Sequence, residues 1–179
     1  PRDAVAEFET QLREKKYASL VAVRYGLAQA QMRAKDVTAA QQQMESITAL
    51  KASSPLIAGL AATISASLGN QPAAQGIYRE SLQRFPQARS LVYGYAESLY
   101  AGRQYDQALA FLESQLQLSA SDYKLFGWQA KTYAALGKRL LQHRAQAEFY
   151  LLQGQLGQAI EQLQFAQQAS DGNFYEQSA

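Results

Sequence analysis

The chain has 179 residues, of which 47% are hydrophobic and 18% are charged, so it can bury a sizeable core and is not intrinsically disordered. It carries a net charge of +2, one histidine and no cysteine. This composition excludes disulfides and thiolate metal sites, argues against nucleic-acid binding, and leaves no apolar run of the roughly 20 residues needed to span a bilayer.

Helices separated by short turns are predicted along the whole chain. Alanine, leucine and glutamine are abundant and favour helix, whereas no segment alternates apolar and polar residues as a strand does. The expected helices are a single one at 2–15, then pairs at 18–34 with 37–51, 55–68 with 71–84, 89–101 with 105–118 and 122–136 with 138–153, and a last one at 156–169. The first helix has the pattern of a second helix of a pair, so we expect the natural protein to continue N-terminally.

Small residues recur at a constant interval along the chain. One set lies in the first helix of each pair, at Ala28, Ala62, Ala96 and Ala130, and a second set with the same interval lies near the start of the second helices, at Ala40, Ala74 and Ala108. Two helices of a hairpin approach closely only where both side chains are small. The spacing therefore predicts helical hairpins that cross at these alanines and stack through larger residues.

A helix–turn–helix unit of about 34 residues with small residues at its eighth and twentieth positions resembles the tetratricopeptide repeat (TPR). Tyr78, Pro86 and Tyr133 also match that family's pattern, whereas its tryptophan at the fourth position is replaced by Arg24, Ala58, Val92 and Phe126. The resemblance implies an all-α helical solenoid of about nine helices that winds as a right-handed superhelix.

The chain is expected to form a single domain over 1–179, the C-terminal part of a longer protein. The predicted repeats are 21–54, 55–88, 89–122 and 123–153, with a partial repeat at 140–170. The period breaks once, between Gly137 and Gly154, so the helix at 138–153 is expected to belong to two units. After Ser170, a turn is expected to let Phe174 and Tyr175 fold back as a cap.

Residues for catalysis are not apparent. With His143 as the only histidine, a helical histidine pair for zinc is excluded, and neither a nucleophile elbow nor a phosphate-binding glycine loop occurs. We therefore predict no enzyme active site and no cofactor in this chain. The basic group at 138–144 is interpreted first as a solvated face, with an acidic-partner contact as the alternative, and Trp128 first as core between repeats.

A partner is expected on the first helices of the pairs, which line the concave surface of such solenoids. Tyrosine supplies a large contact area with few rotatable bonds, as interface anchors do. The predicted protein-binding residues, which include one cation from the basic group, are Tyr25, Gln29, Arg33, Tyr93, Glu97, Tyr100, Lys131 and Arg144. Lysine and asparagine at the positions that grip chaperone carboxylates in some TPR domains are missing, which disfavours that ligand.

A narrower resemblance rests on two runs, Ser19-Leu-Val-Ala-Val-Arg-Tyr-Gly-Leu-Ala28 and the segment 147–163. They are similar to the C-terminal TPR domain of periplasmic zinc metalloproteases of outer-membrane protein assembly. The resemblance implies a periplasmic location and a zinc-binding protease domain outside this chain. It also implies that the chain contacts that protease domain, the β-barrel assembly machinery and outer-membrane proteins such as the lipopolysaccharide transporter LptD.

Two other classes of function remain open. The chain could be a stand-alone TPR scaffold or adaptor with no enzyme attached, and the sequence upstream of Pro1 would distinguish it from the protease module. A nucleic-acid-binding helical repeat is disfavoured by the net charge of +2, and it would require binding that falls steeply with salt.

Overall fold

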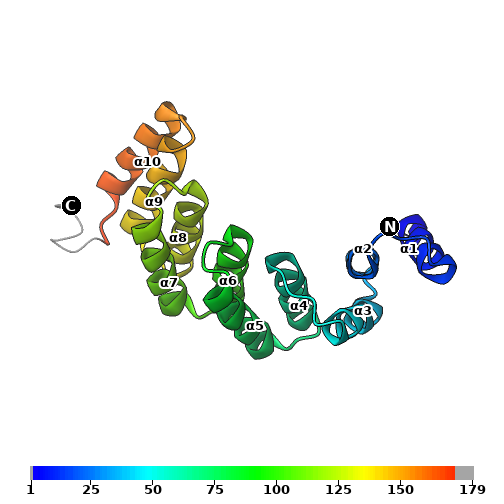
Figure 1. The fold of residues 1–179 in the computed structure, drawn as a ribbon. Coiled ribbons are helices and arrows are strands. Elements are labelled where there is room, and N and C mark those ends of the chain that lie inside the picture. The colour runs from blue at the N-terminus through cyan, green and yellow to red at the C-terminus, as the bar shows by residue number, and fades with distance from the viewer. Residues whose placement is uncertain (1, 172–179) are drawn as a thin grey trace. The chain divides into compact units, whose positions relative to one another are not determined.

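The computed structural model describes residues 2–171, which form ten α-helices and no strand (Figure 1). The helices are α1 (Arg2–Glu14), α2 (Leu20–Arg33), α3 (Val37–Ala49), α4 (Pro55–Ser67), α5 (Gln71–Arg84), α6 (Arg89–Ala101), α7 (Tyr105–Leu118), α8 (Tyr123–Ala135), α9 (Arg139–Leu151) and α10 (Leu156–Gln168). The all-α prediction is confirmed, and the ten helices match the ten ranges expected from the sequence, against about nine implied by the TPR resemblance. None of these helices is long and apolar enough to cross a bilayer.

Short polar side chains start several of the helices. Ser19, Asp36, Ser54 and Asn70 each accept a hydrogen bond from the backbone N–H three residues further on, at 3.0 to 3.3 Å. Each bond satisfies one of the amide groups that a helix N-terminus leaves without a partner in the helix. The turns between helices are therefore encoded locally, which explains why the helix starts could be predicted from sequence.

The helix ends use the left-handed backbone conformation in two ways. Gly69, Gly137 and Gly154 adopt positive φ after α4, α8 and α9, where glycine carries no steric penalty. Basic residues adopt the same conformation after α1, α2, α3 and α6, namely Lys15, Lys35, Lys51 and Arg103. A cation next to a helix C-terminus interacts favourably with the helix dipole, which offsets part of the backbone strain.

The chain groups into two compact units, Pro1–Tyr95 and Ala96–Ala179. In the first unit the predicted alanines are fully buried where helices cross: Ala28, Ala40, Ala62 and Ala74 are all 0% exposed. Ala28 and Ala40 belong to a core cluster with Met44, Ile47 and Ile64, which joins α2, α3 and α4. A second cluster, which includes Ala62, Ala74, Tyr78 and Leu91, joins α4, α5 and α6.

Successive pairs in the first unit pack by complementary size. A Cβ atom at Gly26 would lie 2.6 Å from Phe8 Cζ, and one at Gly94 would lie 2.6 Å from Tyr78 Oη. In both places an aromatic ring of a second helix occupies the space that a glycine leaves on the next first helix. Where the second helix instead carries Met44, the next first helix presents Leu60 to the same cluster.

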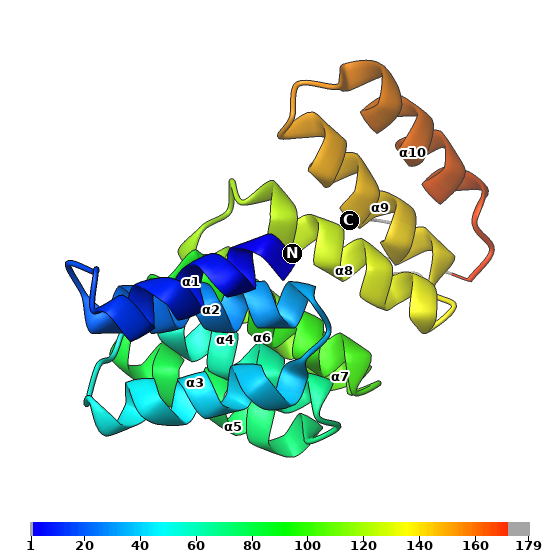
Figure 2. The ribbon, with the colours of Figure 1, turned by 90° about the vertical axis from the view of Figure 1, so that its right-hand side faces the viewer.

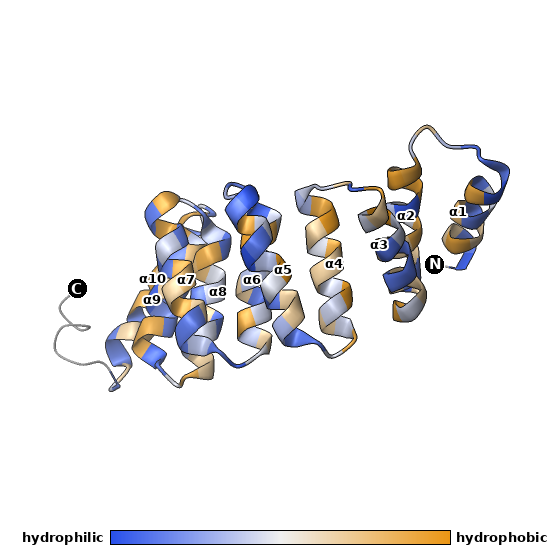
Figure 3. Ribbon diagram, turned by 60° about the horizontal axis from the view of Figure 1, so that its bottom comes forward, coloured by the Kyte–Doolittle hydropathy of each residue, from blue (hydrophilic) through white to orange (hydrophobic). Residues whose placement is uncertain are grey.

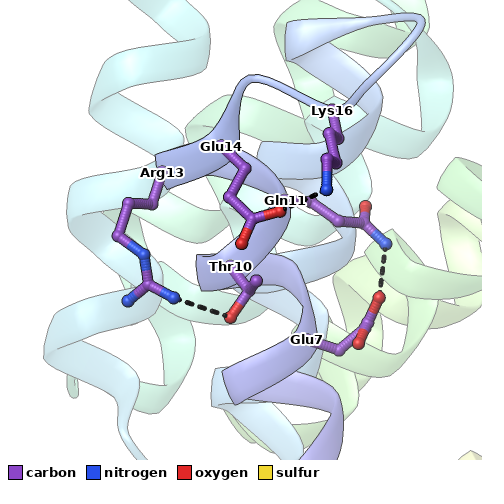
Figure 4. Close-up of polar contacts among 6 residues, drawn as sticks. All are labelled: Glu7, Thr10, Gln11, Arg13, Glu14 and Lys16. Atoms are coloured by element: carbon purple, nitrogen blue, oxygen red, sulfur yellow. Dashed lines mark hydrogen bonds and ion pairs between the residues drawn. The ribbon is translucent and has the colours of Figure 1, made fainter.

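The first helix has no buried residue and a polar outer surface. Figure 4 shows its local pairs: Gln11 Nε2 donates to Glu7 Oε1 at 3.0 Å, and Lys16 Nζ lies 2.7 Å from Glu14 Oε2. These side chains are exposed, and such surface pairs stabilise a helix only slightly. Helix α1 therefore stabilises the fold mainly through its inner side, where the ring of Phe8 packs against Gly26 of α2.

In the second unit, α9 packs against both α8 and α10 (Figure 2). It is thus the second helix of one hairpin and the first helix of the next. Small side chains allow both contacts, because Ala145 and Ala147 are buried on α9 and Ala159 is buried on α10. This double use of one helix accounts for the shortened spacing in the sequence.

The N-terminus of α9 is capped from a distant part of the chain. Lys138 precedes the helix and makes no side-chain cap. Asp171, 31 residues after Leu140, accepts the backbone N–H of Arg139 with one carboxylate oxygen and that of Leu140 with the other, at 3.2 Å. An anionic acceptor at a helix N-terminus also matches the helix dipole. The predicted cap by Phe174 and Tyr175 lies outside the described residues.

We expect Asp171→Ala to destabilise the second unit by about 1 kcal/mol, which is the usual cost of losing an N-cap acceptor. Asp171→Asn keeps an oxygen acceptor and should retain most of that stability. Denaturant unfolding followed by circular dichroism measures both variants. Equal stability of the alanine variant and the unmodified chain would show that this distant cap contributes nothing.

Candidate protein-binding surfaces

Among residues 2–171, no three histidine, aspartate or glutamate side chains come together as a metal site would require. His143 on α9 instead bridges to α10: its Nδ1 lies 2.8 Å from Gln162 Oε1, and its ring centroid lies 5.4 Å from that of Phe165. The amide oxygen can only accept, so Nδ1 donates in this contact. The imidazole thus holds two helices together.

Two predicted residues meet on α2 in the first unit. Gln29 Nε2 donates a hydrogen bond to Tyr25 Oη at 2.9 Å, and Tyr25 is half-buried against the core cluster of α2–α4. The amide fixes the phenol at the surface. Arg33 lies at the end of α2 and is exposed. It lines a hollow of about 510 Å³ together with Arg2, Asp3, Ala34 and Lys35.

Next to α2, helix α4 consists largely of apolar residues, as its colouring in Figure 3 shows. Leu56 is 61% exposed, and Leu60 is half-buried one turn later. Between them, a Cβ atom at Gly59 would meet only Leu91 Cδ2, at 3.8 Å. A methyl group at Gly59 would therefore fit against the buried Leu91 without displacing it.

Two hollows in the first unit lie where the second helices α3 and α5 meet α4. One, of about 370 Å³, is lined by residues of α3, α4 and α5 that include Met44, Ile64 and Ile77. The other, of about 510 Å³, lies beside it, shares Thr48 and Ile77 with it, and reaches the loop before α4. None of the predicted binding residues lines either hollow, so the second-helix side offers a competing surface.

Helix α6 carries three predicted residues, of which Tyr93 and Tyr100 are half-buried and Glu97 is exposed. In the second unit, Tyr100 forms the centre of an aromatic cluster. Its ring centroid lies 5.5 Å from that of Tyr105 on α7 and 5.8 Å from that of Trp128 on α8. Lys131 Nζ lies 4.5 Å from the centroid of the Trp128 ring. The structure thus brings together the predicted Tyr100 and Lys131.

We call the residues Tyr100, Tyr105, Trp128 and Lys131 the aromatic cluster. Its three rings are half-buried and Lys131 is exposed. Half-buried rings combine a large apolar area with fixed orientation, and an ammonium above the indole face adds a cation–π attraction. An arrangement of this kind can hold an apolar or aromatic side chain of a partner.

Two members of the aromatic cluster, Tyr105 and Trp128, are not among the predicted binding residues. The sequence favours a position between repeats for Trp128, and its half-buried side chain does contact Tyr100 of the preceding repeat, as well as Lys131. Tyr105 follows Tyr100 across a turn, a spacing that places two rings together only when the turn is tight. Arg144, the last predicted residue, is half-buried on α9.

No protein-family model matches this chain, and no curated protein matches it. Solved structures do match. YrrB, a TPR protein with an unusual peptide-binding site, has 14% sequence identity and a TM-score of 0.64, over 89% of this chain and 81% of YrrB. The Cut9–Hcn1 hetero-tetramer of the APC/C has 16% sequence identity and a TM-score of 0.65, over 90% of this chain and 32% of the matched chain. A double mutant of MamA from RS-1 has 14% sequence identity and a TM-score of 0.61, over 83% of this chain and 93% of the MamA chain.

These similarities and the packing described above define the class of the chain. It is an all-α solenoid with the fold of tetratricopeptide-repeat domains. The identities are too low to carry more than the fold, because one fold serves many functions.

Proposed function

We propose that this chain is a non-catalytic protein-interaction module that docks apolar segments of other proteins on its first helices. The observation that carries the proposal is the aromatic cluster, whose half-buried rings and exposed Lys131 come from α6, α7 and α8. Aromatic anchors of this kind dominate the energetics of protein interfaces. YrrB, a TPR protein with a peptide-binding site, offers a precedent within the fold.

In finer detail, we propose that the chain is the interaction domain of a periplasmic metalloprotease of outer-membrane assembly, similar to the β-barrel assembly-enhancing protease BepA. The support is the similarity of the runs at 19–28 and 147–163. Its partners would be the β-barrel assembly machinery, outer-membrane proteins such as LptD, and its own protease domain. An unfolded β-barrel protein exposes aromatic and aliphatic side chains, which suit the aromatic cluster and the exposed Leu56.

Zinc belongs to this proposal only through the protease domain. Residues 2–171 do not gather the three or four ligands that a zinc ion requires. In this proposal the metal is held by the protease domain.

The second candidate is a stand-alone TPR scaffold whose partner docks in the hollows beside Thr48 and Ile77. An adaptor that uses its second-helix side would bind there and not at the aromatic cluster. The two candidates therefore differ in the surface to which a partner binds.

The test is the affinity of the chain for a fluorescently labelled segment of LptD. We expect Tyr100→Ala to weaken binding at least about tenfold, because truncation of a central aromatic anchor commonly costs about 2 kcal/mol. Lys131→Ala should have a small effect, since its ammonium is exposed. Affinity should fall only weakly with added salt, because the cluster is largely apolar.

Tyr123→Ala is the matched control. Tyr123 lies in the same unit, is 37% exposed and contacts Phe149, outside the aromatic cluster. Both alanine variants should keep their helical circular dichroism. Equal loss of affinity in the two variants, or in neither, would contradict the proposal.

A further inference from the structure

The last helix carries a stripe of exposed apolar side chains on one flank. Leu156, Ile160 and Leu163 are 60%, 57% and 48% exposed. Spacings of four and three residues place them in a row along α10. We call these three residues the α10 stripe.

Equivalent positions in the earlier second helices indicate how such a stripe is buried. The residue four positions after the buried alanine of a second helix is Met44 in α3, Tyr78 in α5 and Leu112 in α7, and these are 6%, 7% and 0% exposed. The equivalent residue in α10, four positions after the buried Ala159, is Leu163, which is 48% exposed. The side chain at this position is thus buried in α3, α5 and α7 and exposed in α10.

In α3 and α5 the helix that follows next in the chain covers the side chain at this position. The ring of Tyr78 lies against Gly94 of α6, and Met44 shares a cluster with Leu60 of α4. Consecutive helices of helical hairpin arrays run antiparallel. The α10 stripe is therefore shaped to receive one more helix, antiparallel to α10.

The described chain does not itself supply that helix. After α10 it returns towards the start of α9, where Asp171 binds the backbone of Arg139 and Leu140. Residues up to 171 thus leave the α10 stripe open, as the exposures of its three members show.

We propose that the α10 stripe docks against the α10 stripe of a second copy of this chain. The stripe reads Leu-x-x-x-Ile-x-x-Leu, which is nearly symmetric about its centre. Two copies related by a two-fold axis place Leu156 opposite the partner's Leu163 and bring the two Ile160 side chains together. A two-fold interface is closed, so it ends at a dimer.

The charge pattern suits a second copy. From Leu151 to Ser170 the chain carries a single ionisable side chain, Glu161. At about 100° per residue, Glu161 lies more than a quarter turn around the helix from the α10 stripe, so its carboxylate stays at the edge of a contact between two stripes. The centre of the contact is then free of charge, as the cores of stable interfaces are.

The absence of cysteine in the chain allows a direct test. We expect Ile160→Cys to form an intermolecular disulfide under mild oxidation, because a central residue meets its own copy across a two-fold axis. Leu56→Cys is the control, since Leu56 is equally exposed, at 61%, but lies on α4. Non-reducing electrophoresis at equal protein concentration measures the dimer fraction of each variant.

Sedimentation velocity provides an independent readout on the unoxidised chain. The 19.8 kDa chain should approach twice that mass as its concentration rises. Leu163→Glu should raise the dissociation constant of the dimer at least about tenfold, and Leu56→Glu should leave it unchanged. A mass that stays at 19.8 kDa at all concentrations, or crosslinking of both cysteine variants alike, would overturn the proposal.

Discussion

Gly94→Ala is expected to destabilise the first unit by about 1–3 kcal/mol, the usual cost of overpacking a core. The new Cβ atom would lie 2.6 Å from Tyr78 Oη and 2.7 Å from Cε1 and Cζ of the same ring. Tyr78 is 7% exposed and packs against Tyr95 with ring centroids 6.3 Å apart, so its ring has little room to move. Chemical denaturation monitored by circular dichroism measures the change.

The control for this prediction is the same substitution in open space. A Cβ atom at Gly76, within α5, would meet nothing within 4 Å, so Gly76→Ala should stabilise the chain by about 0.5–1 kcal/mol through helix propensity alone. Adding Tyr78→Leu to Gly94→Ala should recover part of the loss, because it removes the clashing ring. Fully additive effects of the two substitutions would contradict the packing at this position.

Ala62→Leu is expected to have a comparable or larger effect. Ala62 is 0% exposed where α4 crosses α5, beside Ala74, which is also 0% exposed. A leucine there must push two helices apart, with an expected cost of about 3 kcal/mol or more. Thermal melts of Ala62→Leu should show a much lower midpoint than those of Gln42→Leu, an exposed position on α3. Similar midpoints would mean that the alanine spacing does not mark helix crossings.

The fold can be read from the sequence because its determinants are local and repeated. The evenly spaced alanines mark the crossings, and Ser, Asp and Asn before several helices provide the caps. The predicted boundaries of α5, α6 and α7 agree with the structure. The left-handed conformation of Lys35 and Lys51 is not predictable in this way, since lysine carries no signal for it.

The candidate site is less readable because it depends on contacts between helices. Repeat positions place Tyr25 and Tyr100 on first helices, but they do not predict the hydrogen bond from Gln29 or the contact with Trp128. The cap that Asp171 provides spans 31 residues to Leu140, which no local pattern reveals. Likewise, the size match of Tyr78 with Gly94 appears only when the two helices are seen packed together.

The central claim is that partners bind on the first helices, and site-specific photocrosslinking tests it most directly. A photoreactive amino acid would replace Tyr25, Tyr93 or Tyr100 on first helices, and Gln83 or Gln107, which are exposed on the second helices α5 and α7. Our account predicts partner crosslinks from the three tyrosine positions and weak or no crosslinks from the two glutamine positions. Crosslinks from Gln83 and Gln107 alone would contradict it and would move the binding surface to the second helices.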